Sequence, residues 1–204
     1  MGCSNSSHNC VSPKKEDSME QLPPTSLTDQ HRVILLDSWK VIQEDIAKVG
    51  VIMFMGLFET HPECKEVFMP FKELQGDDLR WSSALKAHGL RVMAVIERVL
   101  ARIDSDEKIE EHLKALAKKH VEYGANSDLV RLFGPQFIGS MKRQLHKSWS
   151  DEMQDAWTVL FDIIIYHMTT NMVPEQPENN NIAKRQKSSR KSRTKYMIDN
   201  GHSQ

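Results

Sequence analysis

The strongest constraint on this sequence is a pair of segments with helical periodicity, each of which carries one histidine on its apolar face. LKAHGLRVMA (residues 85–94) contains His88, and LKALAKKHVEY (residues 113–123) contains His120. Around both histidines, apolar residues recur at spacings of three, four and seven residues, which place side chains on one face of a helix. Both imidazoles are therefore predicted to point into the core of a helical protein.

A histidine on an apolar face is most often a core residue with its own hydrogen-bond partner, and that interpretation predicts a helical bundle without a cofactor. The alternative is that the two histidines act together. Neutral imidazoles suit iron and other borderline transition metals, and a flat macrocycle between two helices would be covered by their apolar side chains. On this interpretation, His88 and His120 are the two axial ligands of the iron in a haem b. A carbonyl or hydroxyl near the outer nitrogen of His120 would fix its tautomer.

The rest of the chain also has helical periodicity, and no segment alternates with the period of a strand. Thr28 is a candidate N-cap, a break is expected at Glu44–Asp45, and His61–Pro62 should end the second helix. Pro135 should either kink a later helix or lie in its first turn. We expect an all-α fold of six to eight helices, with helical segments at about residues 28–43, 46–61, 79–103, 107–123, 128–149 and 150–172.

Two glycines and three aromatic residues are expected near the first histidine. Gly50 lies in the middle of a predicted helix and Gly89 follows His88, so the two helices can cross closely and bring Phe54 beside that imidazole. Phe68 and Phe71 lie in an otherwise polar loop. Aromatic residues in such a loop either plug the core or cover a flat ligand.

The chain begins with the pattern of a lipidated protein. Met1-Gly2 followed by Ser6 fits N-myristoylation of Gly2, and the adjacent Cys3 is a candidate for palmitoylation. Two acyl chains hold a protein stably on a membrane, whereas one does not. We therefore expect residues 1–26 to be a disordered, lipidated extension before a domain at 27–173.

The C-terminal tail, residues 174–204, lacks the apolar residues needed for folding and is expected to be disordered. Its basic run, from Lys184 to Lys195, could contact anionic lipid, act as a nuclear signal or remain solvated. Net charge gives no sign of a nucleic-acid partner, because 27 basic residues face 28 acidic ones. The longest apolar run, residues 49–58, is too short to span a bilayer.

The three cysteines do not form a disulfide framework, which is typical of a reducing compartment. Cys64 lies in the loop that contains Phe68, and only Cys10 or another chain could pair with it. A free thiol is therefore expected at Cys64 in preference to a redox switch.

From Leu27 to about Val173 the sequence resembles a globin. The resemblance is carried by Trp39, Gly50, LFETHPE (57–63), Phe68, LKAHGLRV (85–92) and LKALAKKH (113–120). It implies that His120 is the proximal and His88 the distal haem ligand, with Phe68 stacked on the haem. It implies further pocket positions at Val92, Leu116, Leu129, Phe133 and Ile163. Arg91, one turn from His88, could pair with a haem propionate or project into water.

The 32-residue separation of the histidines resembles cytoglobin and neuroglobin, and the start Met1-Gly2-Cys3 with long extensions resembles globin X. These likenesses imply a six-coordinate haem at the cytoplasmic side of the plasma membrane. They imply binding of dioxygen and nitric oxide, and redox chemistry with an unidentified reductase: electron transfer, nitrite reduction or nitric oxide dioxygenation. The alternative function is a conventional reversible oxygen carrier, store or sensor in which His88 stays off the iron.

Overall fold

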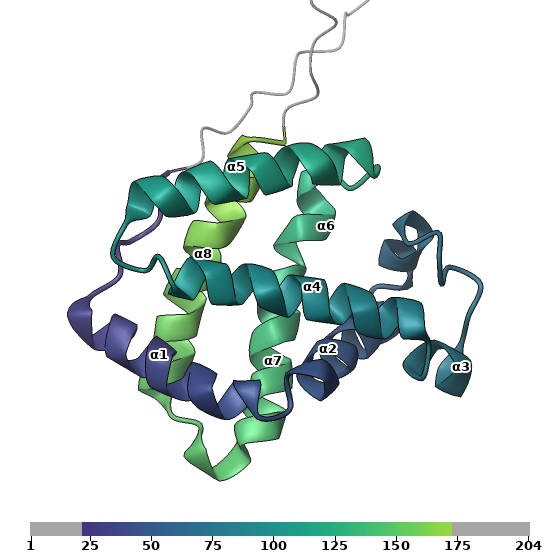
Figure 1. Ribbon diagram of the computed structural model, residues 1–204, viewed down its shortest axis with the longest axis horizontal. Helices are drawn as coiled ribbons and strands as arrows, with labels where there is room; N and C mark the ends of the chain where they lie inside the picture. Colours follow the sequence, from purple (N-terminus) through teal and green to yellow (C-terminus); the bar gives the residue numbers. More distant parts are fainter. Residues whose placement is uncertain (1–21, 173–204) are drawn as a thin grey trace, which may run out of the picture.

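Eight α-helices build residues 22–172, which are the part of the chain that the computed structural model describes (Figure 1). Their bounds are α1 Asp29–Gln43, α2 Ile46–Thr60, α3 Gly76–Arg80, α4 Ser83–Leu100, α5 Asp106–Glu122, α6 Ser127–Arg131, α7 Phe133–Leu145 and α8 Asp151–Thr170. Short 3₁₀ helices lie at Pro62–Val67 and His146–Ser148. Within these residues there is no strand and no helix long and apolar enough to cross a membrane. The predicted all-α class is confirmed.

Local capping explains where several helices begin. The Thr28 side chain accepts a hydrogen bond from the backbone N–H of His31, and His31 Nδ1 accepts one from the N–H of Thr28, so α1 starts with a reciprocal cap. The Ser150 side chain accepts from the N–H of Met153 at 3.2 Å at the start of α8. The first helix ends near the predicted break, and α2 ends at Thr60, before the His61–Pro62 pair.

Two helix predictions were wrong in their boundaries. The helix that carries His88 does not run from residue 79 to 103, because Trp81 and Ser82 interrupt it and the Ser82 side chain caps α4 by accepting from the N–H of Leu85. The predicted helix 128–149 is divided into α6 and α7 at Leu132. Pro135 then lies in the first turn of α7, where its missing N–H removes no helical hydrogen bond.

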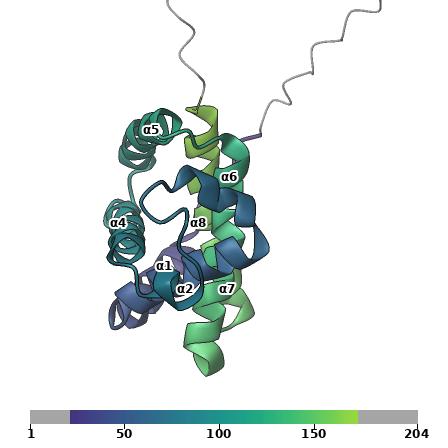
Figure 2. The same cartoon turned by 90° about the vertical axis from the view of Figure 1, so that its right-hand side faces the viewer.

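The two histidine-bearing helices rest on different neighbours. In Figures 1 and 2, α4 and α5 lie on one side of the molecule, and α6, α7 and α8 lie on the other. Helix α4 packs mainly on α2, whereas α5 packs mainly on α8; α2 in turn packs on α7 and α1 on α8. The relative position of α4 and α5 is therefore set through two separate helix pairs and the turn that joins them.

Contact between α2 and α4 is made by their backbones. A Cβ atom built on Gly50 would lie 3.2 Å from the backbone Cα and C of Gly89, and one built on Gly89 would lie 3.2 Å from the backbone C of Gly50. Any larger residue at either position would force the helices apart. The predicted close crossing at these glycines is confirmed.

Aromatic residues fill the centre of the core between α1, α7 and α8. Trp157, Phe137 and Phe161 are fully or almost fully buried, and their ring centroids lie 4.9–6.1 Å apart. The indole N–H of Trp157 donates to the hydroxyl of buried Ser38 at 3.0 Å. This bond satisfies a polar group that would otherwise be buried without a partner.

Candidate functional site

His120 lies near the C-terminal end of α5 and is half-buried. Its Nδ1 lies 3.0 Å from the backbone carbonyl oxygen of Leu116, one turn earlier. Because a carbonyl can only accept, Nδ1 must carry the proton and donate. The other ring nitrogen, Nε2, then keeps a free lone pair, which is the form in which histidine binds a metal.

His88 lies on α4 among aromatic rings from α2 and the following loop. Its ring centroid is 4.9 Å from that of Phe54, 5.0 Å from Phe68 and 6.5 Å from Phe71. The close crossing of α2 and α4 brings Phe54 beside His88, as expected. The loop phenylalanines cover this histidine, and their two rings stack on each other with centroids 5.2 Å apart.

The surroundings of His88 keep its imidazole neutral. Burial lowers the pKa of His88 to about 4, and the positive charge of Arg91 and the electrostatic influence of His120 act in the same direction. His120, which belongs to a different helix, is thus near enough to act on the pKa of His88. His88 therefore carries no charge at neutral pH, as a histidine ligand to a metal must.

Arg91 contacts His88 in a way that the sequence did not predict. Its side chain is exposed, and its Nη2 lies 3.4 Å from Nδ1 of His88. A guanidinium can only donate hydrogen bonds, so Nδ1 of His88 accepts and the ring proton lies on Nε2. The Nε2 atoms of His88 and His120 thus differ: the first is an N–H donor and the second a lone-pair acceptor.

Other predicted pocket residues come from the five helices α4 to α8. Val92, Leu116, Leu129, Phe133 and Ile163 are all half-buried and pack against the core. Phe133 on α7 links the aromatic group around His88 to the central core, since its ring lies 6.4 Å from Phe54 and 5.7 Å from Phe161. Their contacts with a cofactor stay predictions.

The loop between α2 and α3 is closed by two lysine contacts. Lys65 Nζ donates to the backbone carbonyl of Leu74, and Lys72 Nζ forms an ion pair with Glu66 at 2.6 Å. These contacts span the part of the loop that contains Phe68. The sequence does not predict these contacts, because nothing in the order of the charged residues shows which lysine meets which acceptor.

Cys64 is buried in the 3₁₀ helix at the start of this loop. Burial and the adjacent Glu63 carboxylate raise the pKa of its thiol, which lowers its reactivity. Among residues 22–172 it has no cysteine partner. The candidate lipidation sites Gly2 and Cys3, and Cys10, lie outside the described residues.

The donor chemistry of this site fits a haem. Helix α5 supplies an imidazole whose Nε2 lone pair is free, and α4 supplies a second, neutral imidazole. Phenylalanines from α2, α7 and the loop, with aliphatic residues from α5, α6 and α8, give the apolar surroundings that a porphyrin requires. The expected carbonyl near the outer nitrogen of His120 is that of Leu116.

Comparison with known proteins agrees with this geometry. The family model described as Globin matches residues 52–168. Cytoglobin-1 of Oryzias latipes is 27% identical over 150 residues, which cover 72% of this chain and 84% of that protein. An anaerobic nitrite reductase of Gossypium hirsutum is 24% identical over 141 residues, covering 68% and 86%. The crystal structure of a hexacoordinated haem protein from an anhydrobiotic tardigrade at pH 4 has the same fold, with a TM-score of 0.68, 18% identity and coverage of 72% of this chain and 95% of that one.

Proposed function

The chain belongs to the globin family, and we propose that it is a haem b protein in which His120 and His88 are the two axial ligands of the iron. Membership of the family implies a haem cofactor and the binding of diatomic gases. The observation that carries the proposal is a pair of imidazoles from α4 and α5: His88, which is neutral and lies among phenylalanine rings, and His120, whose Nδ1 donates to the carbonyl of Leu116. When bound, haem supplies an iron with a position for a diatomic gas and a one-electron redox couple.

His120 has the role of the permanent ligand. The hydrogen bond from Nδ1 to the Leu116 carbonyl fixes the ring orientation and tautomer, and it raises the basicity of Nε2. Because the acceptor is a backbone group of the same helix, substitution of neighbouring side chains does not remove it. This makes His120 suited to hold the cofactor throughout the functional cycle.

His88 has the role of the displaceable ligand. It is held by ring contacts with Phe54 and Phe68 and by one exposed contact with Arg91. An internal ligand is always present at high effective concentration, so a gas must compete with it and the apparent gas affinity is reduced. When His88 leaves the sixth position, its Nε2–H is available to donate a hydrogen bond to a bound gas.

A six-coordinate site favours redox chemistry over oxygen storage, since a bound His88 opposes oxygen binding but leaves electron transfer unobstructed. The likeness to a plant protein named as an anaerobic nitrite reductase supports nitrite as a substrate. The candidate reactions are electron transfer, nitrite reduction and nitric oxide dioxygenation, each with a reductase partner. The second candidate function is reversible oxygen binding, and the Nε2–H form of His88 favours it.

The absorption spectrum of the gas-free ferrous protein tests this proposal. We expect sharp, split visible bands in the wild type, which collapse to one broad band in His88→Ala. His120→Ala should lose the haem or bind it weakly, with recovery when free imidazole is added. A single broad band in both the wild type and His88→Ala would reject the six-coordinate site in favour of the oxygen carrier.

We further propose that the protein is attached to the cytoplasmic side of the plasma membrane through Gly2 and Cys3. Support comes from the sequence pattern alone, and the basic run near the C-terminus is consistent with it. In cells, Gly2→Ala should move the protein from the membrane to the soluble fraction, and Cys3→Ser should weaken its attachment. Unchanged membrane binding of Gly2→Ala would contradict myristoylation, and nuclear accumulation would favour the nuclear-signal interpretation of the tail.

A further inference from the structure

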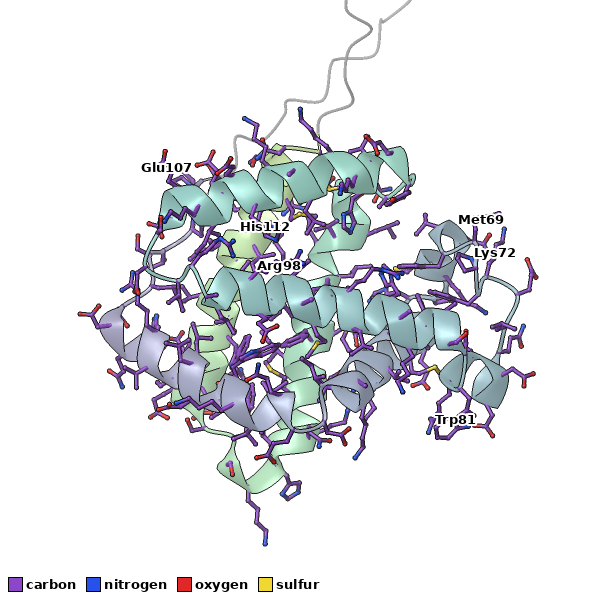
Figure 3. The ribbon with its side chains drawn as sticks, viewed as in Figure 1. Met69, Lys72, Trp81, Arg98, Glu107 and His112 are labelled. Carbon is purple, nitrogen blue, oxygen red and sulfur yellow. The ribbon has the colours of Figure 1, made fainter. Side chains whose placement is uncertain are left out.

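Three basic side chains lie together where α4 and α5 approach the turn that joins them. Arg98 belongs to the last turns of α4, Arg102 to the turn itself and His112 to α5. Figure 3 shows Arg98 and His112 in the space between the two helices, reaching toward each other from opposite sides. Arg98 follows His88 by ten positions along α4, so this group is distinct from the aromatic residues around His88.

Polar atoms in this group lack partners. His112 Nε2 is buried and makes no hydrogen bond to any described residue. The guanidinium of Arg98 has no hydrogen bond or ion pair within residues 22–172. Arg102 donates from Nη1 to the backbone carbonyl oxygen of Arg98 at 3.0 Å. This bond uses one N–H donor of Arg102, but a neutral carbonyl does not neutralise its positive charge. A buried polar group without a partner destabilises the folded state, and a ligand that supplies the partner removes this cost.

The acidic residues nearest to the two arginines along the chain are engaged elsewhere. Asp104 forms an ion pair with Arg32 at 3.3 Å, and Glu97 accepts a hydrogen bond from Gln43 at 2.8 Å. No carboxylate of the described residues is therefore paired with Arg98 or Arg102.

The electrostatics of His112 agree with this arrangement. Burial lowers the pKa of His112, and the positive charges of Arg98 and Arg102 lower it further. All three causes oppose protonation, and none involves an acidic residue that would favour it. The group is thus a concentration of positive charge around a neutral imidazole.

We propose that Arg98, Arg102 and His112 form a binding site for a tetrahedral oxyanion of the phosphate class. Guanidinium groups pair with phosphate oxygens through two parallel N–H donors, and a phosphate has enough oxygens to accept from both arginines and from His112 Nε2. A phosphate also carries more negative charge than a single carboxylate, which suits two guanidinium groups that have no acidic partner. Both arginine side chains are exposed and can close around an ion, while His112 is fixed by burial of its ring nitrogen.

Occupancy of this site affects the helices that carry the predicted ligands. Since α4 rests on α2 and α5 on α8, few contacts hold the two helices to each other directly. A shared anion offsets the repulsion between the positive charges of Arg98 and Arg102 and gives all three side chains a common acceptor. It therefore draws α4 and α5 together at the end next to the turn, and so alters the separation of His88 and His120.

Titration of the full-length protein with sodium phosphate tests the site, with sodium chloride at equal ionic strength as the reference. The readout is the NMR signal of the His112 ring, followed against both phosphate and pH. We expect a saturable shift of this signal and a rise of about one unit in the pKa of His112 at saturation. Arg98→Gln and Arg102→Gln should each weaken phosphate binding roughly tenfold, since each removes charge-assisted hydrogen bonds.

Lys114→Gln is the matched control, because Lys114 is exposed on the same helix and is not part of the group. It should bind phosphate like the wild type, and all variants retain the basic run at residues 184–195. An equal response to chloride, or unchanged phosphate binding in both arginine variants, would overturn the proposal. These readouts do not require haem, so they are independent of the proposed function.

A second arm identifies the source of the phosphate group. Phosphatidylcholine vesicles with and without phosphatidic acid replace the free phosphate. A His112 shift caused by free phosphate assigns the site to a soluble ion or phosphomonoester. A shift caused only by phosphatidic acid vesicles, and lost in Arg98→Gln, assigns it to a lipid headgroup. Absence of a His112 shift in both arms overturns the proposal.

Discussion

Nη2 of Arg91 lies 3.4 Å from Nδ1 of His88, so a side chain one turn along α4 decides which nitrogen of a predicted iron ligand carries the proton. The ring proton then lies on Nε2, the atom that must be free of a proton to bind iron. Arg91 therefore opposes coordination of His88 and favours its role as a hydrogen-bond donor. His120, whose Nδ1 donates to the carbonyl of Leu116, has the opposite preference.

Arg91→Met should increase the fraction of gas-free ferrous protein that is six-coordinate. Loss of a hydrogen bond worth about 1 kcal/mol corresponds to roughly a fivefold change in the coordination equilibrium. The visible spectrum measures this fraction, and carbon monoxide binding should slow in parallel because His88 competes more strongly. Arg80→Met, at an exposed position on α3, is the control. Equal spectra for the wild type and Arg91→Met would show that the guanidinium does not set the tautomer.

Gly50→Ala should destabilise the fold, because the added Cβ would meet the backbone of Gly89 at 3.2 Å and backbone atoms cannot turn aside. We expect a loss of about 1–3 kcal/mol in the free energy of unfolding, measured by urea denaturation. Gly139→Ala on α7 is the matched control, since a Cβ there has no neighbour within 4 Å. It should be neutral or stabilising by up to about 1 kcal/mol. A similar response of both variants would contradict the close crossing.

The haem-free protein should lose stability as the pH falls from 6.5 to about 4. Burial lowers the pKa of His88 from 6.5 to about 4, so between these values the unfolded chain binds a proton that the folded chain rejects. The contribution of His88 to the free energy of unfolding is complete above pH 6.5. It declines between pH 6.5 and about 4 and does not change further at lower pH. Its largest size is about 3 kcal/mol.

Urea denaturation of the wild type and His88→Leu at several pH values measures this contribution. The variant should show the shallower pH dependence. His112→Gln serves as a comparison, because the pKa of His112 is also lowered and its share of the slope has the same sign. Parallel curves for the wild type and His88→Leu would exclude a depressed pKa at His88.

Ser38→Ala should destabilise the core through Trp157. The variant leaves the indole N–H of a fully buried tryptophan without its acceptor at 3.0 Å, at a cost of about 1–3 kcal/mol in the free energy of unfolding. Thr158→Ala on α8 is the control, since its exposed hydroxyl bonds only the carbonyl of Gln154. Thermal unfolding measures the difference: Ser38→Ala should have a lower midpoint temperature than Thr158→Ala. Equal midpoint temperatures would contradict the expectation.

Local signals in the sequence predicted the parts of this fold that depend on few residues. Thr28 and Ser150 mark helix starts by their own side chains, and Gly50 with Gly89 shows where two helices can touch. The break at Trp81 and Ser82 was missed because the apolar periodicity continues across it, while a single serine hydroxyl competes with the helical hydrogen bonds. Apolar periodicity predicts the helix face on which a residue lies, but it does not predict where that helix begins or ends.

Contacts made by long charged side chains could not be predicted from the sequence. Arg91 was expected to meet a propionate or water; its side chain is exposed, and it also reaches His88 along the same helix, a contact that the sequence did not predict. Its pairing with a propionate stays a prediction. The group of Arg98, Arg102 and His112 depends on the angle between α4 and α5, which no local pattern specifies. Charged residues with several rotatable bonds can reach many partners, so their partners become known only from the tertiary structure.

Gly50 and Gly89 also affect how this protein tolerates change in its sequence. A contact between two backbones cannot be relaxed by exchanging one core side chain for another, so the placement of α4 on α2 is insensitive to substitutions elsewhere in the core. The placement of α5 on α8 depends on side-chain volumes and shifts when those volumes change. As related sequences diverge, the helix of His120 is therefore expected to move more than the helix of His88.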